Sequence, residues 1–343
     1  MKPVEIALVD TTGKVHPHTM SAAAAAFNIQ VSQHLRQYWG FAPQVTVRWF
    51  PKSQQIPRSA WPIKLVDKLK FNEGGFHSIT AERPFAKVVA TPGSNDWTID
   101  ASHEALEMLV DPVGNRLWAA RAISLVGTKI TDGEGDLEFL VEICDPCEGP
   151  RYTYEIDGIE VSDFITPDFY AHHAMPNVQY SFTGAIKAPR QVLHGGYITW
   201  VRPKTRRIEQ LLWLATDKQP RLKKMGTAPA SSLREYVDSQ TRHAVHKARA
   251  DYRMKHHGGG KTMPMKFQIG AGEKTKRTQY EKAHTVTYHQ DGEIEREVWD
   301  PGTHKSKIVP EKVKAGVPIK RPPGTDHTVK NLGGSLLTGD KEM

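Results

Sequence analysis

The chain has 343 residues, of which 38% are hydrophobic and 24% charged, a composition typical of a folded protein of about two domains. Its longest apolar run, around Ala22–Phe27, is far shorter than the roughly 18–20 residues that a membrane-spanning helix needs. Glu5 and Asp10 interrupt the stretch in which a secretory signal peptide would be apolar. The two cysteines, Cys144 and Cys147, are too few for a disulfide scaffold and fit a reducing compartment. We therefore expect a cytoplasmic protein with no membrane partner.

Charge and tryptophan content divide the chain into two parts. Residues 1–215 carry 21 Lys and Arg against 23 Asp and Glu, whereas residues 216–343 carry 25 against 15. Seven of the eight tryptophans lie before position 216. Because aromatic side chains build hydrophobic cores, the sequence predicts a globular domain over residues 1–215 and a basic appendage over residues 216–343.

Hydrophobic periodicity predicts helices and strands in the first part, which together make a mixed α/β (α+β) fold. In chain order we expect a strand at 4–10, a helix at 19–38, strands at 44–50, 62–69 and 85–90, a helix at 100–110, strands at 137–143 and 152–161, and a short helix at 205–215. Gly40 follows the first helix, where a C-terminal glycine is favoured. Asp111 precedes a proline and is thereby pushed out of helical geometry, which ends the second helix.

The second part is expected to consist of a basic helix and an extended arm. Residues 230–255 combine many arginines and lysines with only a thin apolar stripe. From His256 onward, glycine and proline interrupt the chain, and apolar residues are too sparse for a core of the arm's own. We expect the arm to become ordered by wrapping other protein subunits. Nucleic acid is the less favoured partner, since the arm lacks the interleaved aromatic residues of a single-strand platform.

The helix at 100–110 carries the strongest chemical signal. With 100° per residue, His103, Glu104, Glu107 and Asp111 fall within an arc of about 100°, and apolar residues occupy most of the remaining circumference. A helix of this kind is usually buried, so its polar stripe is expected to face a cleft.

The spacing of these residues predicts a metal site. His103 and Glu107 lie on adjacent turns of one face and could bind one ion, and Asp111 is the favoured third ligand. Glu104 is offset by one residue and would act as general base on metal-bound water, as in a metal-assisted hydrolase. The alternative is a structural helix with a polar face, in which an N-terminal residue caps the helix and Glu104 complements its dipole.

The stretch SHEALEMLVDPVGN (102–115) resembles the site helix of zincin metallopeptidases, and it also resembles a motif of bacterial and phage proteins that look zincin-like. The resemblance implies a zincin-like domain, a divalent metal, most simply Zn²⁺, and hydrolysis of a peptide substrate, with His103 and Glu107 as ligands and Glu104 as base. It also implies that an edge strand, here Phe85–Ala90, pairs with the substrate. Glu107 departs from the zincin pattern, which has histidine at that position.

A rival interpretation is a non-catalytic assembly protein that uses the same scaffold, such as a phage tail, neck or collar component located in the virion. The replacement of the second histidine by Glu107 and the strongly basic arm favour this interpretation. A single CxxC motif, Cys144-Asp-Pro-Cys147, lacks the second half that a structural zinc site would need. Glu142 and Asp145, beside this motif, are further candidate metal ligands.

Overall fold

The structure is a computed structural model that describes residues 3–40, 44–69, 74–80, 83–90, 96–127, 129–149, 151–230 and 232–257, together with the strands of a C-terminal unit. The chain divides into two compact units, Met1–Tyr252 and Arg253–Met343. The predicted boundary after residue 215 therefore lies inside the first unit. Leu233 and Val237 are buried beyond that boundary, in one cluster with Ile208 and Met225, and extend the core.

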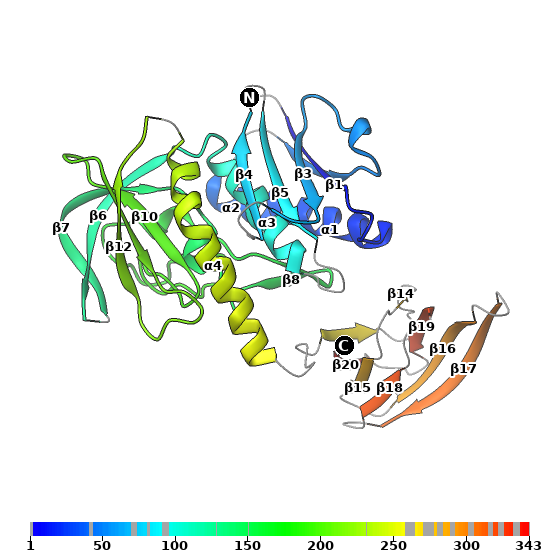
Figure 1. Cartoon of the computed structure of the whole chain (residues 1–343). Helices are drawn as coiled ribbons and strands as arrows, with labels where there is room; N and C mark the ends of the chain where they lie inside the picture. The colour runs from blue at the N-terminus through cyan, green and yellow to red at the C-terminus, as the bar shows by residue number, and fades with distance from the viewer. Residues whose placement is uncertain are drawn as a thin grey trace. The chain divides into compact units, whose positions relative to one another are not determined.

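The first sheet of the first unit contains five strands in the order β2-β1-β3-β5-β4 (Figure 1). These strands are β1 (Val4–Asp10), β2 (Val45–Trp49), β3 (Trp61–Val66), β4 (Gly75–Ile79) and β5 (Pro84–Val89). All neighbours are parallel except β4, which runs antiparallel to β5. The prediction that Phe85–Ala90 forms an edge strand is wrong, because β4 pairs along β5 and occupies the edge itself.

One long helical segment packs on this sheet. α1 (Pro17–Ile29) continues through a π-helical stretch, η1 (Gln30–Leu35), into α2 (Arg36–Trp39). Phe27, Val31 and Leu35 are buried along it. Gly40 ends the segment with φ of 60°, a left-handed conformation that glycine adopts without strain. The helix predicted at 19–38 is confirmed.

The second sheet is antiparallel, in the order β12-β11-β10-β7-β6. Its strands are β6 (Leu117–Val126), β7 (Lys129–Leu140), β10 (Tyr197–Val201), β11 (Arg207–Leu212) and β12 (Arg221–Thr227). The short helix predicted at 205–215 is wrong. Every residue of β11 from Ile208 to Leu212 is buried, and a strand buried on both faces has no alternating pattern to distinguish it from a helix. The hairpin of β8 (Tyr154–Ile156) and β9 (Ile159–Val161) turns at Asp157-Gly158, within the predicted strand region.

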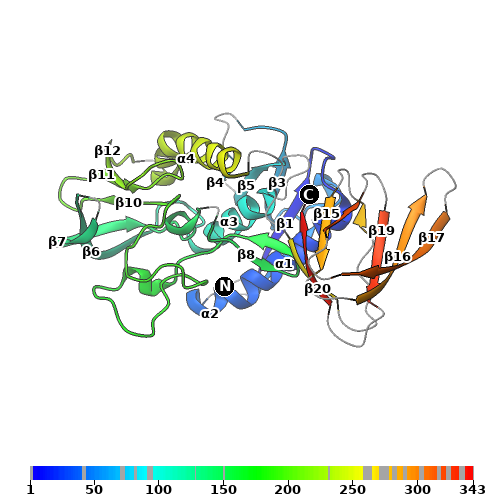
Figure 2. The same ribbon diagram turned by 90° about the horizontal axis from the view of Figure 1, so that it is seen from below.

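Two further helices, α3 (Asp96–Val110) and α4 (Leu233–His257), pack against the sheets of the first unit (Figures 1 and 2). α3 packs against β4, β5 and β9, and α4 runs between the two sheets. On one side Arg242 of α4 donates to the carbonyl of Gly75 on β4. On the other side Val245 and Ala248 pack with residues of the second sheet. The mixed α and β class predicted from the sequence is confirmed. None of the described helices has the length and apolar character needed to cross a lipid bilayer.

The C-terminal unit contains two four-stranded antiparallel sheets, in the orders β13-β20-β15-β18 and β14-β19-β16-β17. The strands are β13 (Met265–Ile269), β14 (Thr278–Gln279), β15 (His284–Tyr288), β16 (Gly292–Asp300), β17 (Lys305–Val313), β18 (Pro318–Arg321), β19 (Asp326–Asn331) and β20 (Leu337–Glu342). Ile294 and Val313 are buried in this unit. The region predicted as an extended arm thus consists largely of paired strands, and its wrapping of other subunits stays a prediction.

Gly114 provides a test of how α4 is seated. It has φ of +65°, and a Cβ added there would lie 2.8 Å from Cβ of Arg234 in the first turn of α4. We expect Gly114→Ala to lower the free energy of unfolding by about 2–4 kcal/mol, from backbone strain plus overpacking. Gly127 is a matched control, since its φ is +61° but nothing lies within 4 Å of an added Cβ. Gly127→Ala should cost only about 1 kcal/mol in urea denaturation. Equal losses in the two variants would contradict this packing.

Candidate metal centre

α3 is buried around its whole circumference. Every residue from Trp97 to Val110 is buried, including Asp100, His103, Glu104 and Glu107. A helix of this kind must satisfy its polar groups with other protein groups rather than with water. The polar stripe predicted from the sequence therefore faces the segment 142–148 and α4 instead of an open cleft.

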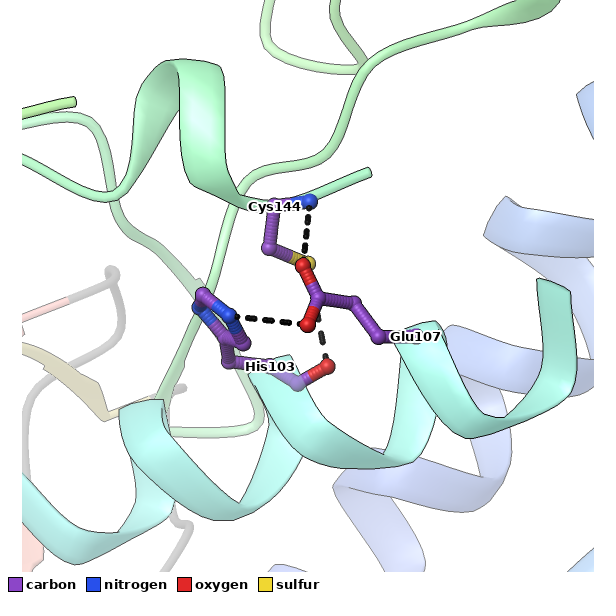
Figure 3. A group of neighbouring side chains, drawn as sticks. All are labelled: His103, Glu107 and Cys144. Atoms are coloured by element: carbon purple, nitrogen blue, oxygen red, sulfur yellow. Dashed lines mark hydrogen bonds and ion pairs between the residues drawn. The ribbon is translucent and has the colours of Figure 1, made fainter. Parts of the chain in front are cut away.

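His103 and Glu107 meet as their i, i+4 spacing predicts. Nε2 of His103 lies 3.2 Å from Oε2 of Glu107 and 3.4 Å from Oδ1 of Asp145. Figure 3 shows the adjoining group, in which Cys144 approaches from the segment that precedes the short helix η3 (Asp145–Cys147). The backbone N–H of Cys144 donates to Oε1 of Glu107 at 3.2 Å, and its thiol lies 3.8 Å from the carbonyl oxygen of His103. Both cysteines are free and buried.

Four groups of side chains among the described residues could hold a metal ion, each with its ligand atoms within 4.8 Å of one another. They are His103, Glu107 and Cys144; His77, Glu104 and Glu107; His103, Asp145 and Glu148; and Glu107, Glu142 and Asp145. Asp111, the third ligand predicted from the sequence, belongs to none of them. It lies just beyond the helix and accepts a hydrogen bond from the backbone N–H of Arg116 at 2.7 Å. The proline that ends α3 does not turn Asp111 back toward His103.

α4 brings three buried arginines to the carboxylates of α3. Nη2 of Arg234 lies 2.8 Å from Oε2 of Glu107, and its Nη1 contacts Glu142. Arg242 lies 3.0 Å from Oε1 of Glu104. Arg249 contacts Asp100 and lies 3.8 Å from Oε2 of Glu148. The helix expected to be a basic surface element is thus the ionic partner of the acidic helix.

Glu104, the predicted general base, is held in the charged form. Burial opposes its ionisation, but the charge of Arg242 and a hydrogen bond from His77, whose Nδ1 lies 2.9 Å away, outweigh burial and lower its pKa to about 2. Burial and then the charge of Arg234 lower the pKa of His77, so the neutral ring donates this hydrogen bond. A carboxylate with so low a pKa has little tendency to take a proton from water at neutral pH.

The cluster contains more carboxylates than arginines. Six buried acids face three arginines; the acids are Asp100, Glu104, Glu107, Glu142, Asp145 and Glu148. Burial and the charge of Glu107 raise the pKa of Asp145 well above its usual range. Burial likewise raises the pKa of Glu148 to about 7. Burial alone would lower the pKa of His103, but Glu107 and Asp145 outweigh it and raise that pKa. The site therefore favours bound protons or a bound cation.

A small cavity adjoins the cluster. Its volume is about 30 Å³, and it is lined by His103, Asp145, Glu148, Tyr197, Arg242 and Arg249, among others. That volume suits a water molecule or a single ion. It is far smaller than the roughly 300 Å³ or more of a typical pocket for an organic ligand.

Comparisons with known proteins give only remote likenesses. No family model matches the chain, and no curated protein matches it. Among solved structures, Drosophila melanogaster CENP-C bound to CAL1 matches with 18% identity over 24% of this chain and 66% of that chain, at a TM-score of 0.21. A cupin domain from Bordetella pertussis matches with 19% identity over 22% and 75%, at a TM-score of 0.19. An oxalate oxidase matches with 17% identity over 22% and 38%, at a TM-score of 0.20. Likenesses of this extent assign no activity to the chain.

These comparisons correct the family and function expected from the sequence. The matching structures described above are cupin-fold proteins and not zincin metallopeptidases, and nothing among them supports a phage or virion component. The resemblance to zincins and the peptidase function expected from it are therefore wrong, and the phage connection has no support from these comparisons. The electrostatics of the site agree with this correction. Arg242 and His77 hold the carboxylate of Glu104 in its charged form with a low pKa, which makes it a poor general base.

Sequence reasoning found part of the cluster and missed the rest. It named His103, Glu107, Glu142 and Asp145, all of which the structure brings together. It missed His77 and Glu148, which come from other segments and carry no local pattern. It also missed the role of the arginines of α4, although a signal was present. At 100° per residue, Arg234, Arg242 and Arg249 fall within an arc of about 80° on one helix face.

Glu104 provides a test of the ionic packing. We expect Glu104→Gln to lower the free energy of unfolding at pH 7 by about 3 kcal/mol, because it leaves Arg242 buried with one counter-ion fewer. Glu5→Gln is the control; it breaks an exposed pair with Arg48 and should cost less than about 1 kcal/mol.

The same variant predicts a pH dependence. Since the folded-state pKa of Glu104 is about 2, against an ordinary value of 4.5, its stabilising contribution is complete above pH 4.5 and is lost as the pH falls toward 2. The stability difference between wild type and Glu104→Gln, measured by urea denaturation, should shrink over that interval. A difference that stays constant with pH would contradict the ionic assignment.

Proposed function

We propose that the first unit binds one divalent transition-metal ion through His103, Glu107 and Asp145, a set in which each pair of residues belongs to one of the four ligand groups described above. The observation that carries this proposal is a set of buried carboxylate oxygens that accept no hydrogen bond within the part of the chain that the structure describes. These are Oε1 of Glu142 and Oε1 of Glu148. Beside them, Oε2 of Glu107, Oε2 of Glu142 and Oδ1 of Asp145 have only ion-pair contacts, to histidine or to Arg234. Buried charged oxygens in native proteins are normally hydrogen-bonded, or they coordinate a metal.

Zn²⁺ is the ion that the donor set fits best. An imidazole nitrogen and two carboxylates are ligands that zinc accepts, and the nearby Cys144 offers a thiol sulfur in the alternative group with His103 and Glu107, which would bind as a thiolate once its proton is displaced. A purely carboxylate site would instead favour magnesium or manganese. The surplus of acids over arginines supplies the negative charge that a divalent cation would offset.

Such an ion would join parts of the first unit that are distant in sequence. His103 and Glu107 belong to α3, whereas Asp145 begins η3, the short helix that follows β7 of the second sheet. Metal binding would thus hold α3 against the second sheet, and its binding free energy would add to the stability of the fold. The proposed function is metal binding by the first unit, without assignment of a reaction.

The direct test is elemental analysis of protein purified without chelators, followed by calorimetric titration of metal-free protein with Zn²⁺ and Mn²⁺. We expect about one zinc per chain, and zinc bound more tightly than manganese. His103→Gln and Glu107→Gln should weaken zinc binding by about 100-fold or more. Even the loss of a residue that only hydrogen-bonds to a metal ligand lowers metal affinity by about 10–100-fold.

Glu209→Gln is the matched control, because Glu209 is also a buried carboxylate but pairs with Arg202 away from the cluster. It should leave zinc affinity unchanged. Protein that contains no zinc, together with no heat of binding and no change in melting temperature on zinc addition, would refute the proposal.

A further inference from the structure

Arg234 occupies the oxygen atoms that the proposed metal ion would use. Its Nη2 lies 2.8 Å from Oε2 of Glu107, the same oxygen that lies 3.2 Å from Nε2 of His103. Its Nη1 contacts Oε2 of Glu142, which belongs to the ligand group of Glu107 and Asp145. The side chain is only 2% exposed, so its charge is compensated by protein groups rather than by water.

The other two arginines of α4 do not share this position. Arg242 contacts Glu104, and Glu104 is further engaged by His77. Arg249 contacts Asp100 and lies 3.8 Å from Glu148, at the opposite end of the cluster. Neither contacts Glu107 or Asp145 among the ion pairs of the described residues. Of the three arginines of α4, only Arg234 therefore places its positive charge on the carboxylate oxygens that the proposed metal ion would use.

A guanidinium and a divalent cation compete for one carboxylate. Both need the lone pairs of Oε2 of Glu107, and their charges repel each other strongly in a buried site. A site that holds the arginine must release it, at least from that oxygen, before the metal gains full coordination. Competition of this kind makes the observed free energy of metal binding less favourable by the free energy that is needed to release the arginine from Glu107.

The structure also provides a place to which the arginine can move. Nε of Arg234 already lies 3.2 Å from Oδ2 of Asp238, one helical turn further along α4, and Asp238 is partly exposed. The other oxygen of Asp238, Oδ1, lies 3.0 Å from Nε of Arg242, so Oδ2 is the oxygen that receives Arg234. The backbone at this end of α4 is anchored separately. The N–H of Arg234 donates to the carbonyl of Gly114 at 3.0 Å, and that of Leu233 donates to the side chain of Asn115 at 2.7 Å. A rotation of the side chain alone can therefore shift the guanidinium toward Asp238.

We infer that Arg234 is a built-in competing cation, which sets the metal affinity of the site and passes from Glu107 to Asp238 when the metal binds. This inference rests on the proposed metal-binding function. It identifies a residue outside the ligand set as the determinant of affinity. Asp238 acts as the positioning residue that receives the displaced charge.

The test is the zinc affinity of the full chain and its variants, measured by calorimetric titration with Zn²⁺ alone. Arg234→Met keeps the length and apolar stem of the side chain but removes the charge, and it should bind zinc about ten-fold or more tightly than wild type. Arg234→Lys retains a cation and should stay within about three-fold of wild type. Asp238→Asn removes the receiving carboxylate and should bind zinc more weakly than wild type.

Lys247→Met is the matched control, since Lys247 is an exposed α4 cation that pairs with Asp251 at 2.5 Å, and it should bind as wild type does. Equal or weaker zinc binding by Arg234→Met would overturn the inference while leaving the proposed function intact. If Arg234→Met does not fold, an unchanged affinity in Asp238→Asn overturns it instead. Absence of zinc binding in wild type and in every variant would refute the proposed function, whereas binding by Arg234→Met alone would support the competition.

Discussion

The structure depends on one electrostatic constraint, which is that six carboxylates are buried against only three arginines. Removing a charge from water costs several kcal/mol unless an opposite charge or hydrogen bonds compensate it. The arginines of α4 compensate Glu104, Glu107, Asp100 and Glu142 directly. The remaining acids around Asp145 rely on protonation, on His103 or on a cation. This residual imbalance makes the cluster a candidate site rather than an ordinary ionic core.

The fold delivers these charges from distant parts of the chain. α3 follows the first sheet and carries three of the acids, the segment 142–148 follows β7 and carries the other three, and α4 follows the second sheet and carries the arginines. Because α4 runs between the two sheets, its apolar residues pack on the second sheet while its arginines reach α3 (Figures 1 and 2). The ionic contacts therefore join the two sheets within the first unit, and a substitution on α4 would alter the charges around the candidate metal site.

Local periodicity predicted what lies within one element, and it failed for what different elements contribute. The helix at 100–110 and the contact between His103 and Glu107 follow from 3.6-residue spacing, and the structure confirms both. The same spacing contains no information about Arg234, whose contact with Glu107 spans more than a hundred positions of sequence. The resemblance to zincins failed for this reason, since a His-Glu-x-x-Glu pattern records two neighbouring turns but not the charges that surround them. The sequence of β11 predicts a helix because burial on both faces removes the alternation typical of a strand.

The location of a bound metal tests the central claim most directly. Crystals of the protein grown with zinc and measured on both sides of the zinc absorption edge would place the ion by its anomalous scattering. The account predicts one strong peak among Nε2 of His103, Oε2 of Glu107 and Oδ1 of Asp145, at about 2.0–2.2 Å from each. It also predicts that the guanidinium of Arg234 no longer contacts Glu107. A fully occupied zinc peak elsewhere in the first unit, or none there at saturating zinc, would contradict it.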